Sequence, residues 1–323
     1  MKYEHVLAFA LEHPWAVTDS MRAIIVNILA QRIAGEQPDP AELSALVNRQ
    51  NLPQPTRGGV AIIPLYGVIA PRMNMLSEMS GGTTFEALTG HLHAALANDA
   101  VKTIVFDVDS PGGNVAGARE FAGEVLKARA QKPVIAVAQY LMASAAYWPM
   151  ACATQIVASP SAMIGAIGIY HIHDDISEAL AKAGIKREVL SAGKFKAEGA
   201  DGGALSEEAR DHRKGLIASA YASFVADVAK GRNVNASAVK GGYGEGRTVN
   251  AETALELGMI DRIGTLAETL ARVGPSAKSP TPSAVATGQE LPLAAATPQE
   301  LQADVHWQSR MLGELLALEA DSI

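Results

Sequence analysis

A serine and a lysine in the middle of the chain lie in sequence surroundings that suit nucleophilic catalysis. Ser144 lies in the small-residue run 140–148, between the apolar segment 133–138 and a predicted helix. A strand that passes into a helix at such a turn can present a serine Oγ where the helix N-terminus favours negative charge. Lys196, in the segment 191–198, is the candidate general base. No Gly-x-Ser-x-Gly motif surrounds Ser144, which excludes the usual nucleophile elbow of hydrolases.

A second segment has the composition of an oxyanion-binding loop. Residues 103–108 predict a buried strand, and the sequence Asp-Ser-Pro-Gly-Gly-Asn follows at 109–114. Pro111 fixes one φ angle, while Gly112 and Gly113 allow backbone shapes closed to other residues. A loop of this kind can turn a backbone N–H toward a developing oxyanion. Taken alone, the pattern favours an ordinary strand-to-helix turn.

Five short segments in a fixed order carry a family resemblance. They are 109–114 (DSPGGN), 143–147 (ASAAY), 164–168 (IGAIG), 193–196 (GKFK) and 246–261 (GRTVNAETALELGMID). Together they cover roughly residues 58–264 and resemble the protease IV or signal peptide peptidase family of serine peptidases. That family includes the head-maturation proteases of tailed phages, the minor capsid protein C-like branch. The resemblance implies a Clp/crotonase-like α/β spiral of ββα units and assembly into a homo-oligomer.

The resemblance also assigns roles to particular residues. It makes Ser144 the nucleophile and Lys196, rather than Lys194, the general base. It places the oxyanion donors at the backbone N–H groups of Gly113 and Ala145. Two departures from the family pattern are the pair Ala145-Ala146, where Gly-Gly is frequent, and Pro149, which we expect to kink the helix after the nucleophile.

The lysine can act as a base only when it is neutral. The ordinary pKa of a lysine is about 10.4, and burial disfavours the ammonium form. We expect Phe195, Met142 and Tyr147 to provide apolar surroundings for Lys196, while Lys194 stays in solvent.

The histidines offer a rival mechanism. His171 and His173 follow Ser144 at a spacing close to that of the Clp proteases, which use a Ser-His-Asp triad, and the alternation at 169–173 predicts a strand. A metal site with Asp174 has no third ligand at a recognisable spacing, so surface or interface histidines are favoured and no metal or cofactor is predicted. We favour the lysine, because the segment around it matches the family. His91 and His93 are expected on the solvent side of a helix.

Composition predicts an ordinary enzyme without a membrane span. The 323 residues are 48% hydrophobic, and the net charge of −7 gives no support for nucleic-acid binding. The lone Cys152 excludes an internal disulfide and fits a reducing compartment. No run of about 18 apolar residues exists, and charges interrupt the N-terminus too early for a signal peptide. We therefore expect a cytoplasmic protein, which favours the phage branch over membrane-anchored signal peptide peptidases.

The chain is predicted to have four parts. A helical N-terminal extension with a linker spans 1–57, the peptidase domain 58–272, a disordered Pro/Ala-rich linker 273–299, and a short helical docking or scaffold-like tail 300–323. Alternating strands and helices in the second part predict α/β layering. Strands are expected near 60–63, 66–69, 103–108, 134–138 and 155–158, and helices from a capping box at 83–86, over 115–130 and over 207–230.

The predicted function is cleavage of capsid, portal or scaffold proteins, and of the chain itself, during phage head maturation. One alternative is a cytoplasmic peptidase of the same family that degrades signal peptides. Another is a non-catalytic capsid scaffold or binding protein that keeps the fold. A crotonase-type acyl-CoA enzyme shares the fold but needs neither Ser144 nor Lys196.

Overall fold

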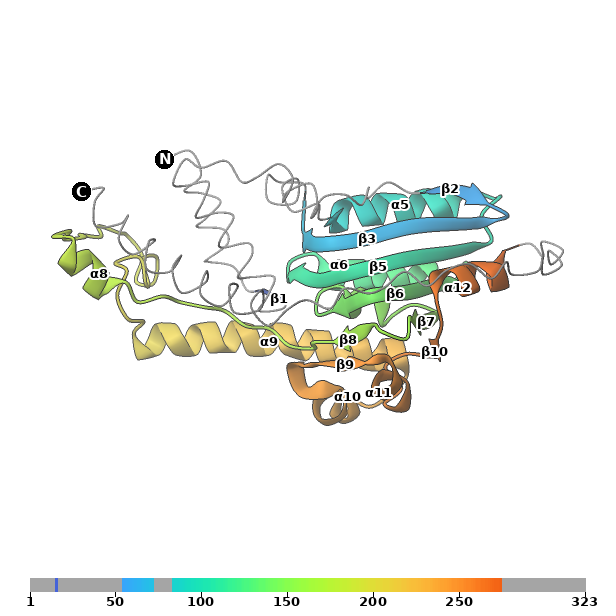
Figure 1. Cartoon of the computed structure of the whole chain (residues 1–323). Helices are drawn as coiled ribbons and strands as arrows, with labels where there is room; N and C mark the ends of the chain where they lie inside the picture. Colours follow the sequence, from blue (N-terminus) through green and yellow to red (C-terminus); the bar gives the residue numbers. More distant parts are fainter. Residues whose placement is uncertain (1–14, 17–53, 73–82, 275–323) are drawn as a thin grey trace, which may run out of the picture. The chain divides into compact units, whose positions relative to one another are not determined.

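The computed structural model describes residues 15–16, 54–72 and 83–274 (Figure 1). The described residues form two compact units: the chain up to His173 together with the chain from Arg210, and the segment Asp174–Ala209. Most of the predicted N-terminal extension, nearly all of the linker 273–299 and the tail 300–323 lie outside the described residues.

A mostly parallel sheet lies at the centre of the first unit. Its strands run in the order β10-β7-β6-β5-β3-β2, and only β2 is antiparallel to its neighbour along this path. The strands of this path are β2 (Gln54–Arg57), β3 (Val60–Ala70), β5 (Thr103–Asn114), β6 (Val134–Ala143), β7 (Gln155–Ala158) and β10 (Arg262–Ile263). Four further short strands pair off this path: β1 (Trp15–Ala16), β4 (Thr83–Thr84), β8 (Met163–Gly165) and β9 (Thr248–Asn250). The predicted α/β class is confirmed.

Helices cover both faces of this sheet. Alternate residues of β5 separate the two cores: Ile104 and Phe106 belong to the large core, and Val105 to a smaller one against which Leu266 and Leu270 pack. The helices are α5 (Phe85–Ala97), α6 (Ala118–Ala128), α7 (Tyr147–Met150), α8 (Ser177–Lys182), α9 (Glu207–Arg232), α10 (Ala236–Gly242), η1 (Gly244–Gly246), α11 (Ala251–Glu256) and α12 (Leu266–Val273).

Some boundaries differ from the sequence prediction. The two strands expected at 60–63 and 66–69 form the single strand β3, whose pairing with β5 shifts register around Gly67 (φ 66°). Residues 54–57, predicted as linker, form the edge strand β2. The N-cap of α5 is Thr84 rather than Thr83, since the Thr84 hydroxyl accepts from Ala87 N at 3.1 Å.

The sheet holds one buried carboxylate that sequence patterns did not indicate. Asp107 of β5 is 5% exposed. It accepts a hydrogen bond from the hydroxyl of Tyr66 on β3 and another from Gln139 Nε2 on β6 at 2.6 Å. These bonds satisfy the carboxylate and cross-link the three central strands.

The second unit has little regular structure. Its helix α8 has no buried residue, and Ile176 N donates to Gly202 O at 2.9 Å to close the segment into a loop. In the described parts of the whole chain, no helix combines the length and apolar composition needed to cross a membrane.

Candidate active site

Ser144 directly follows the carboxyl end of β6 and has an unusual backbone conformation. Its φ is 54°, in the left-handed region that costs a non-glycine residue about 1–2 kcal/mol. Its N–H donates to Gly165 O of β8 at 2.7 Å, and its carbonyl accepts from Trp148 N at 3.0 Å. The side chain is 2% exposed. Strained backbone of this kind is concentrated at functional sites. Among the described residues Ala166, Asn233 and Glu245 also have a positive φ, and of these four only Ser144 has a nucleophilic side chain.

The turn after Ser144 is anchored by packing behind it. Trp148 stacks on Phe224 of α9 with ring centroids 4.4 Å apart, and its Nε1 donates to Asp227 Oδ2 at 2.9 Å. The hydroxyl of Tyr147 donates to Met259 O at 2.9 Å. The segment is therefore fixed at the core side by hydrogen bonds to two distant parts of the chain.

The predicted helix after the nucleophile is a single turn. Pro149 lies inside α7, which ends at Met150 and passes into turns before β7. In the first turn of a helix a missing N–H costs little. Pro149 therefore lies within a helix of one turn, and there is no long helix for it to kink.

The Pro-Gly-Gly segment is a strand, not a free loop. β5 continues through 109–114, where Ser110 Oγ donates to Gly67 O at 2.6 Å and accepts from Gly112 N at 3.2 Å. Gly113 packs so closely on β3 that an added Cβ lies 2.0 Å from Ile69 O. Only glycine fits this position with the present backbone.

The sheet brings the two predicted segments together. β5 and β6 are parallel neighbours, and Ser110 pairs with Met142, two residues before Ser144. Both segments therefore leave the sheet at its carboxyl edge, where ligand sites of parallel sheets form. Gly113 and Ala145 are both buried. Their assignment as oxyanion donors stays a prediction.

Lys196 belongs to the second unit. It lies in a series of turns after Gly193, whose φ is 99°, and Lys196 N donates to Gly193 O at 3.1 Å. Its side chain is exposed in the single chain, and Phe195, one expected apolar neighbour, is 51% exposed. The other two expected neighbours, Met142 and Tyr147, are buried in the core of the first unit.

Lys194 has partners of its own within the same unit. Its Nζ lies 3.0 Å from Glu208 Oε1 and 4.4 Å from the centroid of the Phe195 ring. The pair is exposed, so its contribution to stability is small. The exposure of Lys194 agrees with its predicted position in solvent.

The histidine segment does not form the predicted strand. Within 169–173 only Tyr170 makes a bridge, and His171 and His173 are half-buried. Among the described residues no three histidine, cysteine, aspartate or glutamate side chains are grouped so as to hold a metal ion. On the helix α5, His93 is exposed and 2.7 Å from Glu124, whereas His91 is half-buried and burial lowers its pKa.

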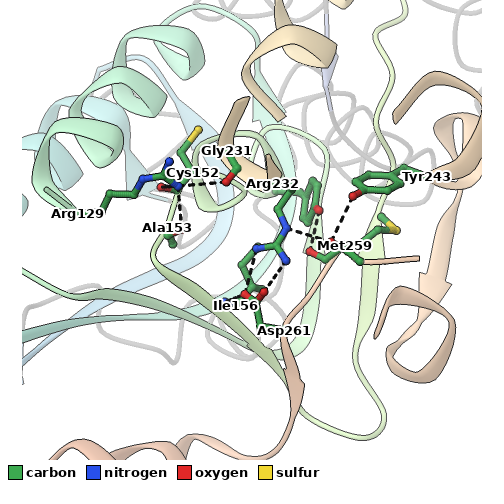
Figure 2. A network of polar contacts seen from close by, with 11 residues as sticks. Arg129, Cys152, Ala153, Ile156, Gly231, Arg232, Tyr243, Met259 and Asp261 are labelled. Carbon is green, nitrogen blue, oxygen red and sulfur yellow. Dashed lines mark hydrogen bonds and ion pairs between the residues drawn. The ribbon is translucent and has the colours of Figure 1, made fainter. Parts of the chain in front are cut away.

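A polar network that sequence reasoning missed surrounds the end of α9 (Figure 2). Arg129 donates to Cys152 O, Ala153 O and Gly231 O at 3.1–3.3 Å. Gly231 permits this approach, because a Cβ there lies 2.3 Å from Ala151 O. These hydrogen bonds connect the end of α6 to α9 and to the turns that follow α7.

The second half of the network centres on Arg232. Its guanidinium binds both carboxylate oxygens of Asp261, at 2.6 and 3.0 Å, and its Nε donates to Gly258 O at 3.1 Å. Ile156 N also donates to Asp261 at 2.7 Å. Burial opposes ionisation of Asp261, but the bonds from Arg232 and Ile156 outweigh it and hold the pKa of this carboxyl below its usual value. No spacing rule in the sequence links an arginine and an aspartate this far apart.

Comparison with known proteins finds a family match over part of the chain. Residues 127–278 match the family model described as "Peptidase family S49", a range that contains Ser144, Ala145 and Lys196. The head-tail preconnector protein GP5 of Enterobacteria phage P21 is 29% identical over 205 residues, covering 64% of this chain and 40% of that protein. The capsid assembly protease C of Escherichia phage lambda is 26% identical over 205 residues, covering 64% of this chain and 46% of that protein.

A cellular relative and a solved structure are also similar. Protease 4 of Salmonella typhi is 29% identical over 227 residues, covering 70% of this chain and 36% of that protein. The chain thus spans less than half the length of these three curated relatives. A membrane-bound stomatin-specific protease structure aligns with a TM-score of 0.40 and 16% identity, over 67% of this chain and 85% of that one. The family match assigns residues 127–278, just under half of the chain, to peptidase family S49, the protease IV family of serine peptidases, and these relatives are similar over a longer part of the chain.

Proposed function

We propose that the chain is a serine endopeptidase in which Ser144 is the nucleophile and Lys196 the general base. The observation that supports this proposal most strongly is the strained backbone of Ser144 at the carboxyl edge of the sheet, beside the end of β5. In the proposal, the N–H groups of Gly113 and Ala145 bind the oxyanion. The fold is proposed to be the Clp/crotonase-like spiral of ββα units, with residues 58–272 as the peptidase domain.

The proposed reaction has two halves. The neutral amine of Lys196 accepts the proton of Ser144 Oγ as that oxygen attacks the carbonyl carbon of the scissile peptide bond. The amine nitrogen of the departing segment receives the proton from Lys196, which leaves an acyl ester on Ser144. Water then attacks the ester with the same lysine as base, releasing the new carboxyl end and restoring the serine. Backbone N–H groups stabilise the negative oxygen in both halves.

The exposure of Lys196 adds a condition to this mechanism. A base must be neutral, and removal from water favours the neutral amine. We propose that a neighbouring subunit, together with bound substrate, covers Lys196, so that the active form is a homo-oligomer.

The proposed substrates are extended segments of capsid, portal or scaffold protein, and of the chain itself, in the cytoplasm of an infected host. Similarity to a capsid assembly protease and a head-tail preconnector, at 26% and 29% identity, supports this choice. Similarity to Protease 4 at 29% identity supports a second candidate, a cellular peptidase that uses the same residues. The substrates proposed for this candidate are signal peptides. The tail 300–323 is proposed as a docking segment, and no cofactor is proposed.

The test is the intact mass of the purified full chain over time, alone and with the capsid protein from the same genome. Wild type is compared with Ser144→Ala, Lys196→Ala and the matched control Lys194→Ala. We expect shortening of the chain or its partner in wild type and Lys194→Ala, and none in the other two variants.

Each other pattern contradicts a stated part of the proposal. Cleavage by Lys196→Ala but not by Ser144→Ala removes the lysine from the mechanism and moves the base to His171 or His173. Cleavage of a synthetic signal peptide with an intact capsid protein favours the second candidate. An unchanged mass in every sample, including samples assembled with capsid protein, favours the non-catalytic scaffold.

A further inference from the structure

Two residues near the start of the chain pair with the end of β5. β1 is antiparallel to β5, with Trp15 opposite Asn114 and Ala16 opposite Gly113. Gly113 is also paired, in parallel, with Ile69 of β3. Because a strand has only two edges, β1 lies on the edge of β5 opposite β3. That is the edge along which β6 pairs further back, where Ser110 is opposite Met142.

The edge is available because β6 turns away from it. β6 ends at Ala143, and the next residue, Ser144, donates its N–H to Gly165 of β8. From there on β6 does not cover β5, and the backbone at Gly113 and Asn114 presents an edge next to the strained serine. Such an edge binds an extended peptide by adding a strand.

We propose that this edge is the peptide-binding strand of the site and that Trp15 and Ala16 are its intramolecular occupant, which a substrate must displace. The inference rests on the peptidase function proposed above. Any peptide bound in the same register puts one residue opposite Gly113, the predicted oxyanion donor, as Ala16 is now. Trp15 and Ala16 therefore compete with substrate for this edge.

The direction of β1 is the one that a substrate needs. The chain direction from Trp15 to Ala16 runs opposite to that of β5, from Asn114 to Gly113. It therefore points toward Ser110 and the residue paired with it, Met142 of β6. The chain thus approaches the end of β6, and hence Ser144, from its amino-terminal side. In a peptidase this is the side of the substrate that forms the acyl ester.

Asn114 supplies a second feature of the same edge. Its side chain is 3% exposed, and its Oδ1 accepts from Ala116 N at 2.8 Å. Among the described residues nothing accepts a hydrogen bond from its Nδ2. A buried donor without a partner is costly, and Trp15, although it lies opposite Asn114, does not satisfy it. A substrate that places an acceptor at Nδ2 therefore gains a hydrogen bond that β1 lacks. Asn114→Asp keeps the acceptor for Ala116 and removes the donor, so we expect it to raise the KM for peptide substrates.

An internal competitor has a definite kinetic signature. If only a fraction of molecules has a free edge, the apparent affinity for substrate is the intrinsic affinity multiplied by that fraction. A saturating substrate concentration restores the full rate. In an antiparallel pair, hydrogen-bonded and non-bonded residues alternate. Only one of the N–H groups of Trp15 and Ala16 therefore donates to β5, and proline at that position removes the bond.

The kinetic test uses the full chain and fluorescein-labelled casein as the probe. Trp15→Pro and Ala16→Pro are compared with Trp15→Phe and Ala16→Ser, which keep the N–H. One proline variant is expected to lower KM by about threefold to tenfold, the effect of one net hydrogen bond, with kcat unchanged. An equal KM in all five active proteins overturns the internal competitor while leaving the peptidase intact.

A second measurement does not depend on activity. In the Ser144→Ala background, hydrogen exchange of the segment 109–117 reports whether β1 protects the edge. Faster exchange at Gly113 or Asn114 in the proline variant supports the pairing, and equal exchange overturns it. If none of the proteins that keep Ser144 cleaves casein, the proposed peptidase function is contradicted. That conclusion does not depend on the hydrogen-exchange result.

Discussion

Arg232 and Asp261 form a two-point ion pair, with contacts of 2.6 and 3.0 Å, that joins the end of α9 to the residue before β10. The Arg232 side chain is 8% exposed and that of Asp261 34%. Because Asp261 also accepts from Ile156 N on β7, the pair fixes the helix against the sheet edge. Its loss affects the whole support behind the turn at Ser144.

Removing one partner of this pair is expected to destabilise the fold. Arg232→Ala leaves the carboxylate without its cation and Gly258 O without a donor, so we expect a loss of about 3 kcal/mol in the free energy of unfolding. Urea unfolding followed by circular dichroism measures this loss. Lys214→Ala is the control, since its pair with Asp211 at 3.5 Å is exposed and its loss costs less than about 1 kcal/mol. Equal effects of the two substitutions contradict the structural role of Arg232.

The same pair predicts a dependence of stability on pH. Burial alone opposes ionisation of Asp261, but Arg232 and Ile156 N lower its folded-state pKa below the unfolded value. The stabilising contribution is therefore complete above the unfolded value, about pH 4, and is lost as pH falls through the folded value. In wild type the urea midpoint should fall more steeply with acidification than in Asp261→Asn. Parallel curves for the two proteins contradict this assignment.

Cys152 is predicted to be chemically inert in the folded chain. Burial raises the pKa of its thiol to about 12, and the side chain is fully buried. Thiolate is the reactive form, so at pH 8 a colorimetric disulfide reagent should not react until urea unfolds the protein. One thiol should then react per chain. Rapid reaction in native buffer, with Cys152→Ala as the blank, shows that the site opens without global unfolding.

Local patterns decided most of what the sequence predicted correctly. β7 has the predicted bounds, and α9 ends two residues beyond the predicted end, at Arg232, because apolar residues recur along it at helical spacing. Ser144 was identified from small neighbours between a strand and a helix, and it lies at the end of a strand as predicted.

Long-range contacts decided what the sequence did not reveal. Residues 109–114 have turn composition, yet they continue β5, because β3 lies alongside and Gly113 admits its backbone. Residues 169–173 contain a single bridge, at Tyr170, so the strand predicted from their alternation does not form. The bond between Arg232 and Asp261 joins residues 29 positions apart, and no local pattern specifies it.

The strain at Ser144 predicts an inversion of the usual order of alanine and glycine. At ordinary positions glycine is less stable than alanine by about 0.5–1 kcal/mol. At φ 54° the order should reverse, and we expect Ser144→Gly to be about 1 kcal/mol more stable than Ser144→Ala. Urea unfolding of both variants measures the difference, and neither should cleave protein. If Ser144→Ala is the more stable variant, the left-handed backbone is not maintained in solution.

Gly113→Ala is expected to damage both stability and activity. The new Cβ would lie 2.0 Å from Ile69 O and 2.6 Å from Ile69 N, so β3 and β5 must separate. Overpacking of this kind costs about 1–3 kcal/mol and moves the N–H that is predicted to bind the oxyanion. Gly123→Ala in α6 is the matched control, because nothing lies within 4 Å of its added Cβ, and alanine there should stabilise the helix by up to about 1 kcal/mol. A Gly113→Ala protein that unfolds at the wild-type urea concentration and cleaves at the wild-type rate contradicts both the close packing of β3 on β5 and the predicted oxyanion role.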